Sequence, residues 1–158
     1  MTALLRRSEQ RVRNLGFFET VEVRTLQGSA PDKIVVDVRV AEKSTGELSF
    51  GAGFSTSEGV LGDVRLTERN LLGRGQEIRA NFTVSQRRQE IDFSFTEPYF
   101  LNRDLAAGVD LFFRETDFQS EASYDETVRG GTLRAGYPLT ENLRHAVRYT
   151  LRQDDIHN

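Results

Sequence analysis

The stretch Glu77-Ile78-Arg79-Ala80-Asn81-Phe82-Thr83-Val84-Ser85 alternates strictly between polar and apolar side chains. Successive side chains of a β-strand point to opposite faces of its sheet, so this period of two indicates a strand with one apolar and one polar face. A polar turn at residues 86–89 follows, and Ile91, Phe93 and Phe95 then alternate with polar residues again. The sequence therefore predicts an antiparallel pair of amphipathic strands here.

The same alternation extends in both directions from this pair, with turn residues between the repeats. Ser57-Glu58-Gly59 and residues 70–75 are turn-rich, and a polar loop covers residues 119–126. Pro98 is expected to end a strand because proline cannot donate to a central ladder. We predict a mainly β chain with about seven antiparallel strands in an up-and-down meander of the kind that closes into barrels. The remaining predicted strands cover residues 46–56, 63–67, 105–114, 132–137 and 143–152.

The N-terminal segment follows a different pattern. Apolar residues recur at helical spacing over residues 3–15, and Gly16 follows as a residue able to take the left-handed conformation of a helix C-cap. Strands around Val21 and Val23 and over residues 34–40 flank a turn-rich segment, which predicts a hairpin. A helix on a short hairpin has too little apolar surface to be stable comfortably alone.

Composition excludes several classes of protein. Lys and Arg number 21 against 24 Asp and Glu, so no basic surface is expected to bind nucleic acid. Cysteine is absent, which excludes disulfides and Cys-ligated zinc. No run approaches the roughly 20 apolar residues of a membrane helix, and residues 1–7 do not form a signal peptide. His145 and His157 lack partners at metal-ligand spacing, and no nucleophile, base and oxyanion hole come together, so we expect no metal, no cofactor and no enzymatic activity.

Alternation alone does not decide which way the apolar face points. In a soluble barrel the apolar side chains fill the interior, whereas in a membrane barrel they meet lipid and the polar side chains line a wet lumen. Two features favour the membrane barrel. The polar face carries charges of both signs, and aromatic residues such as Phe54, Tyr99 and Tyr137 lie near strand ends, where a membrane-interface girdle would place them.

Three strings of residues add a resemblance that covers nearly the whole chain. Residues 11–23 contain Leu15-Gly16-Phe17-Phe18, residues 36–46 run through Glu42-Lys43, and residues 69–75 precede the string of residues 96–101. In order, they resemble the last helix and strand of a POTRA domain, the passage from its final strand into a barrel, and two turn regions of that barrel. The chain is similar in this way to the BamA (YaeT) family of outer-membrane β-barrel assembly factors.

The resemblance implies a domain organisation. Residues 1–43 would be the C-terminal part of a POTRA domain, a helix on a β-hairpin, located in the periplasm. Residues 44–158 would be the N-terminal strands of a transmembrane β-barrel in the outer membrane of a Gram-negative bacterium. Family barrels have about sixteen strands, so the barrel here is incomplete. A Val-Arg-Gly-Phe loop motif marks the family, and Val128-Arg129-Gly130-Gly131 does not match it.

The resemblance also implies a function without bond chemistry. Family members fold and insert other barrel proteins, and their partners are unfolded outer-membrane protein clients, assembly-complex lipoproteins and outer-membrane lipid. In the family the first barrel strand pairs weakly with the last, and this lateral gate opens so that a client strand adds to the first strand by β-augmentation. Residues 35–40 would form a second, weaker contact edge for client peptides or lipoproteins.

Particular residues follow from this assignment. The first gate strand would be residues 46–56, where Gly51 and Gly53 loosen the strand or else relieve crowding at a tight curve. The predicted gate residues are Leu48, Ser49, Phe50, Gly51, Ala52, Gly53 and Phe54. The predicted hinge between the periplasmic and membrane parts is Glu42, Lys43, Ser44 and Thr45, and the predicted structural motif is Glu97, Pro98, Tyr99 and Phe100.

Two alternative functions stay open at this point. One is a two-partner-secretion or translocation-type transporter, which shares POTRA domains and the barrel but exports its client. The other belongs to a different class: a soluble β-barrel module that binds a small apolar ligand.

Overall fold

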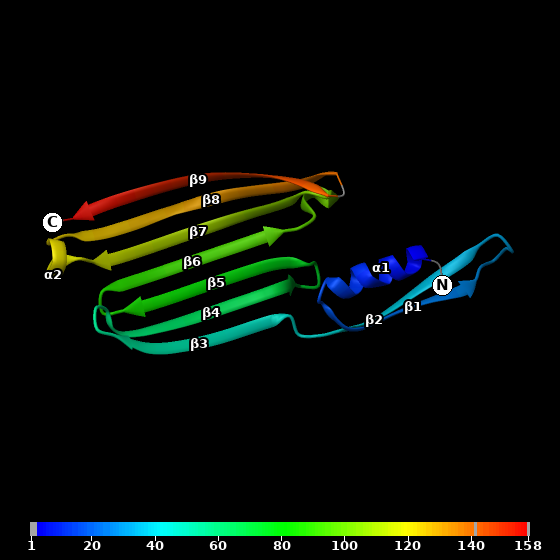
Figure 1. Cartoon of the computed structure of the whole chain (residues 1–158), viewed down its shortest axis with the longest axis horizontal. Helices are drawn as coiled ribbons and strands as arrows, with labels where there is room; N and C mark the ends of the chain where they lie inside the picture. The colour runs from blue at the N-terminus through cyan, green and yellow to red at the C-terminus, as the bar shows by residue number, and fades with distance from the viewer. Residues whose placement is uncertain (1–2, 141, 158) are drawn as a thin grey trace. The chain divides into compact units, whose positions relative to one another are not determined.

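The computed structural model describes residues 3–140 and 142–157 and divides into two units, Met1–Thr45 and Gly46–Asn158. It confirms the expected fold class: a helix and a hairpin in the first unit, then seven antiparallel strands in the second (Figure 1). Neither α-helix in the described part of the chain is long and apolar enough to span a bilayer.

The first unit consists of helix α1 (Ala3–Asn14) and strands β1 (Phe18–Gln27) and β2 (Ile34–Glu42). Gly16 ends the helix at φ 74°, the left-handed conformation that the sequence predicted. Helix α1 packs on β1, where Val21 and Val23 are buried at 2% and 7% exposure, while the valines of β2 stay about half exposed. The buried core of this unit is therefore small, as expected for a helix on a hairpin.

The second unit is one sheet in which every strand pairs with its neighbours along the chain, so β3 and β9 are its two edges. Figure 1 shows the strands side by side in that order. Their bounds are β3 (Gly46–Ser55), β4 (Gly59–Leu71), β5 (Gln76–Ser85), β6 (Arg88–Glu97), β7 (Ala106–Asp117), β8 (Asp125–Thr140) and β9 (Leu143–His157).

Two connections differ from the sequence-based prediction. The turn between β5 and β6 is shorter than residues 86–89, because the Ser85 hydroxyl accepts the backbone N–H groups of Arg87 and Arg88 at 3.2 and 2.9 Å and closes the turn early. The loop predicted at residues 119–126 contains a short helix, α2 (Gln119–Ala122). The Asp117 carboxylate accepts the Gln119 N–H at 2.7 Å at its start, and Ser123 at φ 58° follows its end.

The strand register places apolar side chains on one face of the second unit, called the apolar face below, and most charged side chains on the other, called the polar face. The row of paired residues through Phe50 is apolar across five strands and then becomes polar. The row through Glu68 does the reverse. The first row is Phe50, Val64, Phe82, Ile91, Phe113, Arg129 and Gln153, and the second is Gly46, Glu68, Ile78, Phe95, Val109, Leu133 and Tyr149.

The apolar band therefore crosses the sheet diagonally. Its centre moves by about one residue per strand, which at about 3.3 Å per residue and about 4.8 Å between strands corresponds to a tilt of about 35° between the strands and the normal of the band. Strands of membrane barrels tilt by about 35–45° to the barrel axis. Side chains within the band are widely exposed, with Phe50 at 73% and Leu133 at 61%. A broad exposed apolar face of this kind marks contact with a protein or a membrane.

Candidate functional site

Strand β3 carries the seven predicted gate residues and lies at an edge of the sheet. Each of its residues pairs with β4, from Gly46 opposite Glu68 to Ser55 opposite Gly59. Within the described residues no strand pairs with its other side. The strand therefore presents a row of backbone N–H and C=O groups to which a further strand can bind. Leu48, Phe50, Ala52 and Phe54 point to the apolar face, and Ser49, Gly51 and Gly53 lie on the polar face.

The two glycines of β3 face larger side chains of β4. The Asp63 carboxylate occupies the place where a β-carbon on Gly51 would lie. A β-carbon on Gly53 would approach Leu61 Cδ1 at 3.3 Å. A glycine opposite a larger side chain leaves room for that side chain to lie over the backbone. The glycine itself then contributes no side-chain packing to β3. Both readings of these glycines, loosening and relief of crowding, are compatible with this geometry.

The hydrogen bonds of the Ser49 and Ser55 side chains of β3 stay within the strand and the turn that follows it. Ser49 bonds to Glu47 of the same strand, at 3.3 Å, and Ser55 bonds within the following turn. Backbone pairing joins every residue of β3 to β4, whereas the strands at the centre of the sheet are also joined by side-chain bonds.

Arg134 is the main cross-link of the central strands. Its guanidinium donates to both oxygens of Asp110 on β7, at 2.7 and 2.9 Å, and to the Ser94 and Thr96 hydroxyls on β6, both at 3.0 Å. Gly108 makes this reach possible, because a β-carbon there would lie 2.8 Å from Arg134 Nη2. Bidentate, charge-assisted bonds of this kind are among the strong hydrogen bonds of proteins. Three strands are thereby fastened together on the polar face.

Other polar contacts reinforce the same part of the sheet. Arg114 of β7 bonds to Glu90 of β6, and the Thr132 and Thr150 hydroxyls join β8 to β9 at 2.9 Å. Sequence reasoning did not find these contacts, since partners such as Ser94 and Arg134 lie 40 residues apart and meet only through the strand register. Alternation marked the residues as polar-face residues but carried no signal for their pairing.

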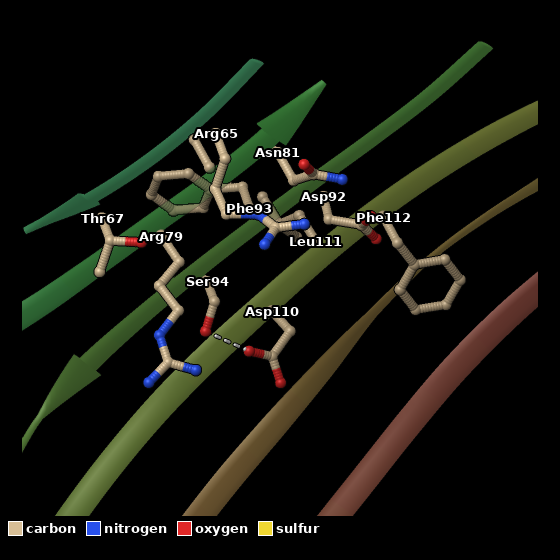
Figure 2. Close-up of a pocket in the computed structure, with 11 residues that line it drawn as sticks. Arg65, Thr67, Arg79, Asn81, Asp92, Phe93, Ser94, Asp110, Leu111 and Phe112 are labelled. Atoms are coloured by element: carbon tan, nitrogen blue, oxygen red, sulfur yellow. Dashed lines mark hydrogen bonds between the residues drawn. The ribbon is translucent and has the colours of Figure 1, made fainter. Parts of the chain in front are cut away.

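A hollow on the polar face spans β4 to β7. Figure 2 shows Arg65, Arg79, Ser94 and Asp110 extending from neighbouring strands into it, with the Ser94–Asp110 hydrogen bond of 2.7 Å across two of them. Arg79 pairs with Glu77 of its own strand at 2.7 Å. Groups of both charge signs line the hollow, which suits a wet lumen and contains no arrangement for bond chemistry. The described residues also contain no cluster of three or more acidic or histidine side chains suited to a metal ion.

The predicted hinge residues divide between the two units. Glu42 is the last residue of β2 and pairs with Phe18, and the Lys43 N–H donates to the Phe17 carbonyl at 3.2 Å. Both therefore belong to the hairpin. Ser44 and Thr45 lie outside any helix or strand, and the boundary between the units follows Thr45. Of the four predicted hinge residues, Ser44 and Thr45 are therefore the two that do not belong to the hairpin.

The Glu97-Pro98-Tyr99-Phe100 motif ends β6 and shapes the turn to β7. Glu97 accepts the Tyr99 N–H at 2.9 Å with one carboxylate oxygen and the Gln76 side-chain amide at 2.6 Å with the other. The Phe100 N–H donates to the Leu105 carbonyl at 2.8 Å and closes the turn. The strand ends directly before Pro98, as its lack of an N–H predicts.

Comparison with known proteins gives a consistent picture. A family model described as the Omp85 superfamily domain matches residues 70–158. Two relatives are both named outer membrane protein assembly factor BamA. The one from Neisseria meningitidis serogroup B is 29% identical over 89% of this chain, and the one from Nitratidesulfovibrio vulgaris is 31% identical over 88%. The chain spans 18% and 17% of their lengths, less than a fifth.

A solved structure matches the fold over the whole length. The crystal structure of BamA from Haemophilus ducreyi lacking POTRA domains 1–3 covers 99% of this chain with a TM-score of 0.78 and 24% sequence identity, and the chain covers 30% of it. The helix and hairpin of the first unit, and the seven-stranded sheet of the second unit, each have a fold found in that protein.

Proposed function

The chain belongs to the Omp85 superfamily of outer-membrane assembly factors, and on that premise we propose that β3 is the strand to which a client β-strand is added as the client enters the membrane. Family membership excludes the alternative of a soluble binding module, because proteins of this family lie in the outer membrane. They are not enzymes. The apolar face of the second unit accordingly meets lipid, and the polar face lines the lumen.

The observation that carries this proposal is the contrast between β3 and the central strands. β3 lies at an edge, two of its polar-face positions are glycines, and its serine side chains bond within their own strand and the following turn. Strands β6 to β8 are joined through Arg134. In lipid an unpaired strand edge has no water to bond its backbone groups, so it recruits another strand. A sheet whose central strands are cross-linked and whose edge strand β3 is unpaired on one side can act as a template to which a client strand is added.

We also propose roles for the first unit, for the segment between the two units and for the partners. The first unit is the end of a POTRA domain in the periplasm, and Ser44 and Thr45 form the hinge to the barrel. The clients are unfolded outer-membrane proteins, and assembly-complex lipoproteins are further partners. The β2 edge around residues 35–40 offers a second place where an extended peptide can pair.

Photo-cross-linking in living cells tests the proposal. A benzophenone amino acid at Ala52 of β3 is compared with the same group at Ala80 of β5, because both alanines lie on the apolar face and only Ala52 is in an edge strand. We expect adducts with newly made outer-membrane proteins from position 52 and none from position 80. Equal labelling from both positions, or labelling from position 80 alone, would refute the proposal.

A further inference from the structure

Two hollows meet at the end of the sheet where β5 begins and β6 ends. One is polar and contains a cation, an anion and an aromatic ring. The other is mainly apolar and opens beside it. Gln76 and Glu97 line both. The polar hollow is lined by Arg74, Gln76, Glu97, Tyr99 and Asn102, and the apolar one by Gln76, Phe95, Glu97, Phe100, Ala107, Gly108 and Val109.

The charged groups of the polar hollow are available to a ligand. Glu97 is held in place by the amide of Gln76 and the N–H of Tyr99, and each of its oxygens accepts only one of these bonds. A carboxylate offers about four lone-pair sites, so acceptor capacity remains. Arg74 and Glu97 attract each other electrostatically, and neither of them is in a salt bridge in the part of the chain that the structure describes. The hollow therefore presents one positive and one fixed negative group.

The apolar hollow lies on the lipid-facing side of the barrel. Phe95 and Val109 are paired neighbours on the apolar face, and Ala107 lies opposite Glu97 two residues further along, on the same face. Phe100 borders this hollow at 44% exposure, and Tyr99 borders the polar one at 59%. Tyrosine is enriched at membrane–water interfaces, and the end of a barrel strand lies near such an interface.

Two leucines mark the same end of the sheet. Leu72 and Leu101 occupy the turns after β4 and β6, are 85% and 72% exposed, and both have positive φ, at 54° and 58°. Branched residues rarely adopt this conformation, and a strained backbone that exposes an apolar side chain is a functional hint. Side chains of this kind are stable when they insert between lipid headgroups and acyl chains.

We propose that the two hollows together bind one zwitterionic phospholipid with a primary ammonium group. Arg74 pairs with its phosphate, Glu97 accepts from its ammonium, and an acyl chain lies over Phe95, Ala107 and Val109. A lipid with a net negative headgroup would meet the same arginine but would leave Glu97 facing a group without positive charge. The site depends on the membrane setting of the barrel and not on strand addition at β3.

Native mass spectrometry of the detergent-solubilised protein tests this site. The protein is mixed with equal amounts of phosphatidylethanolamine and phosphatidylglycerol that carry identical acyl chains. We expect the bound ratio to favour phosphatidylethanolamine by about tenfold, which corresponds to about 1.4 kcal/mol. Phosphatidylcholine, whose quaternary ammonium has no N–H, should bind between the two.

Four variants separate the contributions. Glu97→Gln should bring the ratio near one, and Arg74→Gln should weaken both lipids about equally. Ala107→Phe fills the apolar hollow and should weaken both without changing their ratio. Arg103→Gln removes a cation from the same turn that does not line either hollow, and should have no effect.

The outcomes decide the proposal in either direction. A wild-type ratio near one, or an undiminished preference in Glu97→Gln, would overturn it. Each variant is first checked for the gel shift of a folded barrel on heating. If Glu97→Gln fails to fold because its turn bonds are lost, Arg74→Gln and Ala107→Phe leave those bonds intact. Undiminished lipid binding in both of these variants would equally overturn the proposal.

Discussion

Asp63 of β4 lies directly opposite Gly51 of β3, and its carboxylate fills the space of the β-carbon that Gly51 lacks. Strand β4 can therefore pack its Asp63 side chain over β3 only because position 51 is a glycine. Any side chain at position 51 must displace the carboxylate, so the two positions are energetically coupled.

This coupling is measurable by a double-mutant cycle. We expect Gly51→Ala to destabilise the folded barrel by about 1 kcal/mol, because over-packing forces neighbouring groups to move. In an Asp63→Ala background the same change should cost less than about half of that, since neighbours in contact are non-additive. The midpoint of urea unfolding in lipid vesicles gives both values. Additive effects within error would show that Asp63 does not constrain Gly51.

Arg134 fastens β6, β7 and β8 together, so its removal should loosen the centre of the sheet. We expect Arg134→Ala to lower the free energy of unfolding by about 2 kcal/mol, because Asp110 loses a charge-assisted bidentate partner. Arg134→Lys should recover only part, since an ammonium cannot reproduce the planar fork.

The matched control for this experiment is Arg79→Ala, because Arg79 is also a polar-face arginine. Among the described residues Arg79 forms its one ion pair with Glu77 of the same strand, and its side chain is 62% exposed. The expected loss is at most about 0.5 kcal/mol. Equal losses for the two arginines, measured by urea titration, would contradict the role given to Arg134.

The assignment of the two faces predicts opposite responses at adjacent residues. Phe82 lies on the lipid-facing apolar band and Asn81 on the lumen side. We expect Phe82→Arg to cost about 2–4 kcal/mol when the barrel folds into lipid, the cost of an arginine near the bilayer midplane. Asn81→Arg should be tolerated within about 1 kcal/mol, because a side chain on the lumen side does not enter the lipid. A larger loss for Asn81→Arg than for Phe82→Arg would show that the polar face, and not the apolar face, meets lipid.

The parts of the fold that depend on local signals were predictable from the sequence. Alternation located the strands, Gly16 and Pro98 marked the ends of a helix and a strand, and the seven-strand meander followed from turn spacing. Short-range bonds moved the boundaries: the Ser85 hydroxyl closes a turn that composition alone made two residues longer. Helix α2 was missed because four residues carry no periodicity.

The candidate site was predictable only in part. The position of β3 follows from its being the first strand of the second unit, but the side-chain bonds that join the central strands depend on the register. Arg134 reaches Thr96 across 38 residues of sequence and needs Gly108 to make room. Such a relationship exists only once the register is fixed. The diagonal of the apolar band likewise needed the pairing of every strand before its tilt could be derived.

If β3 receives a client strand at its free edge, disulfides between the two strands will form at a defined register. Cysteine at Ser49 of β3 is combined with single cysteines along the terminal strand of a client, and oxidation is applied during assembly. Cysteine at Thr83 of central strand β5, another polar-face position, is the control. We expect strong adducts at one register, weaker ones two residues away and none from position 83. Adducts spread evenly along the client, or equally strong from position 83, would contradict strand addition at β3.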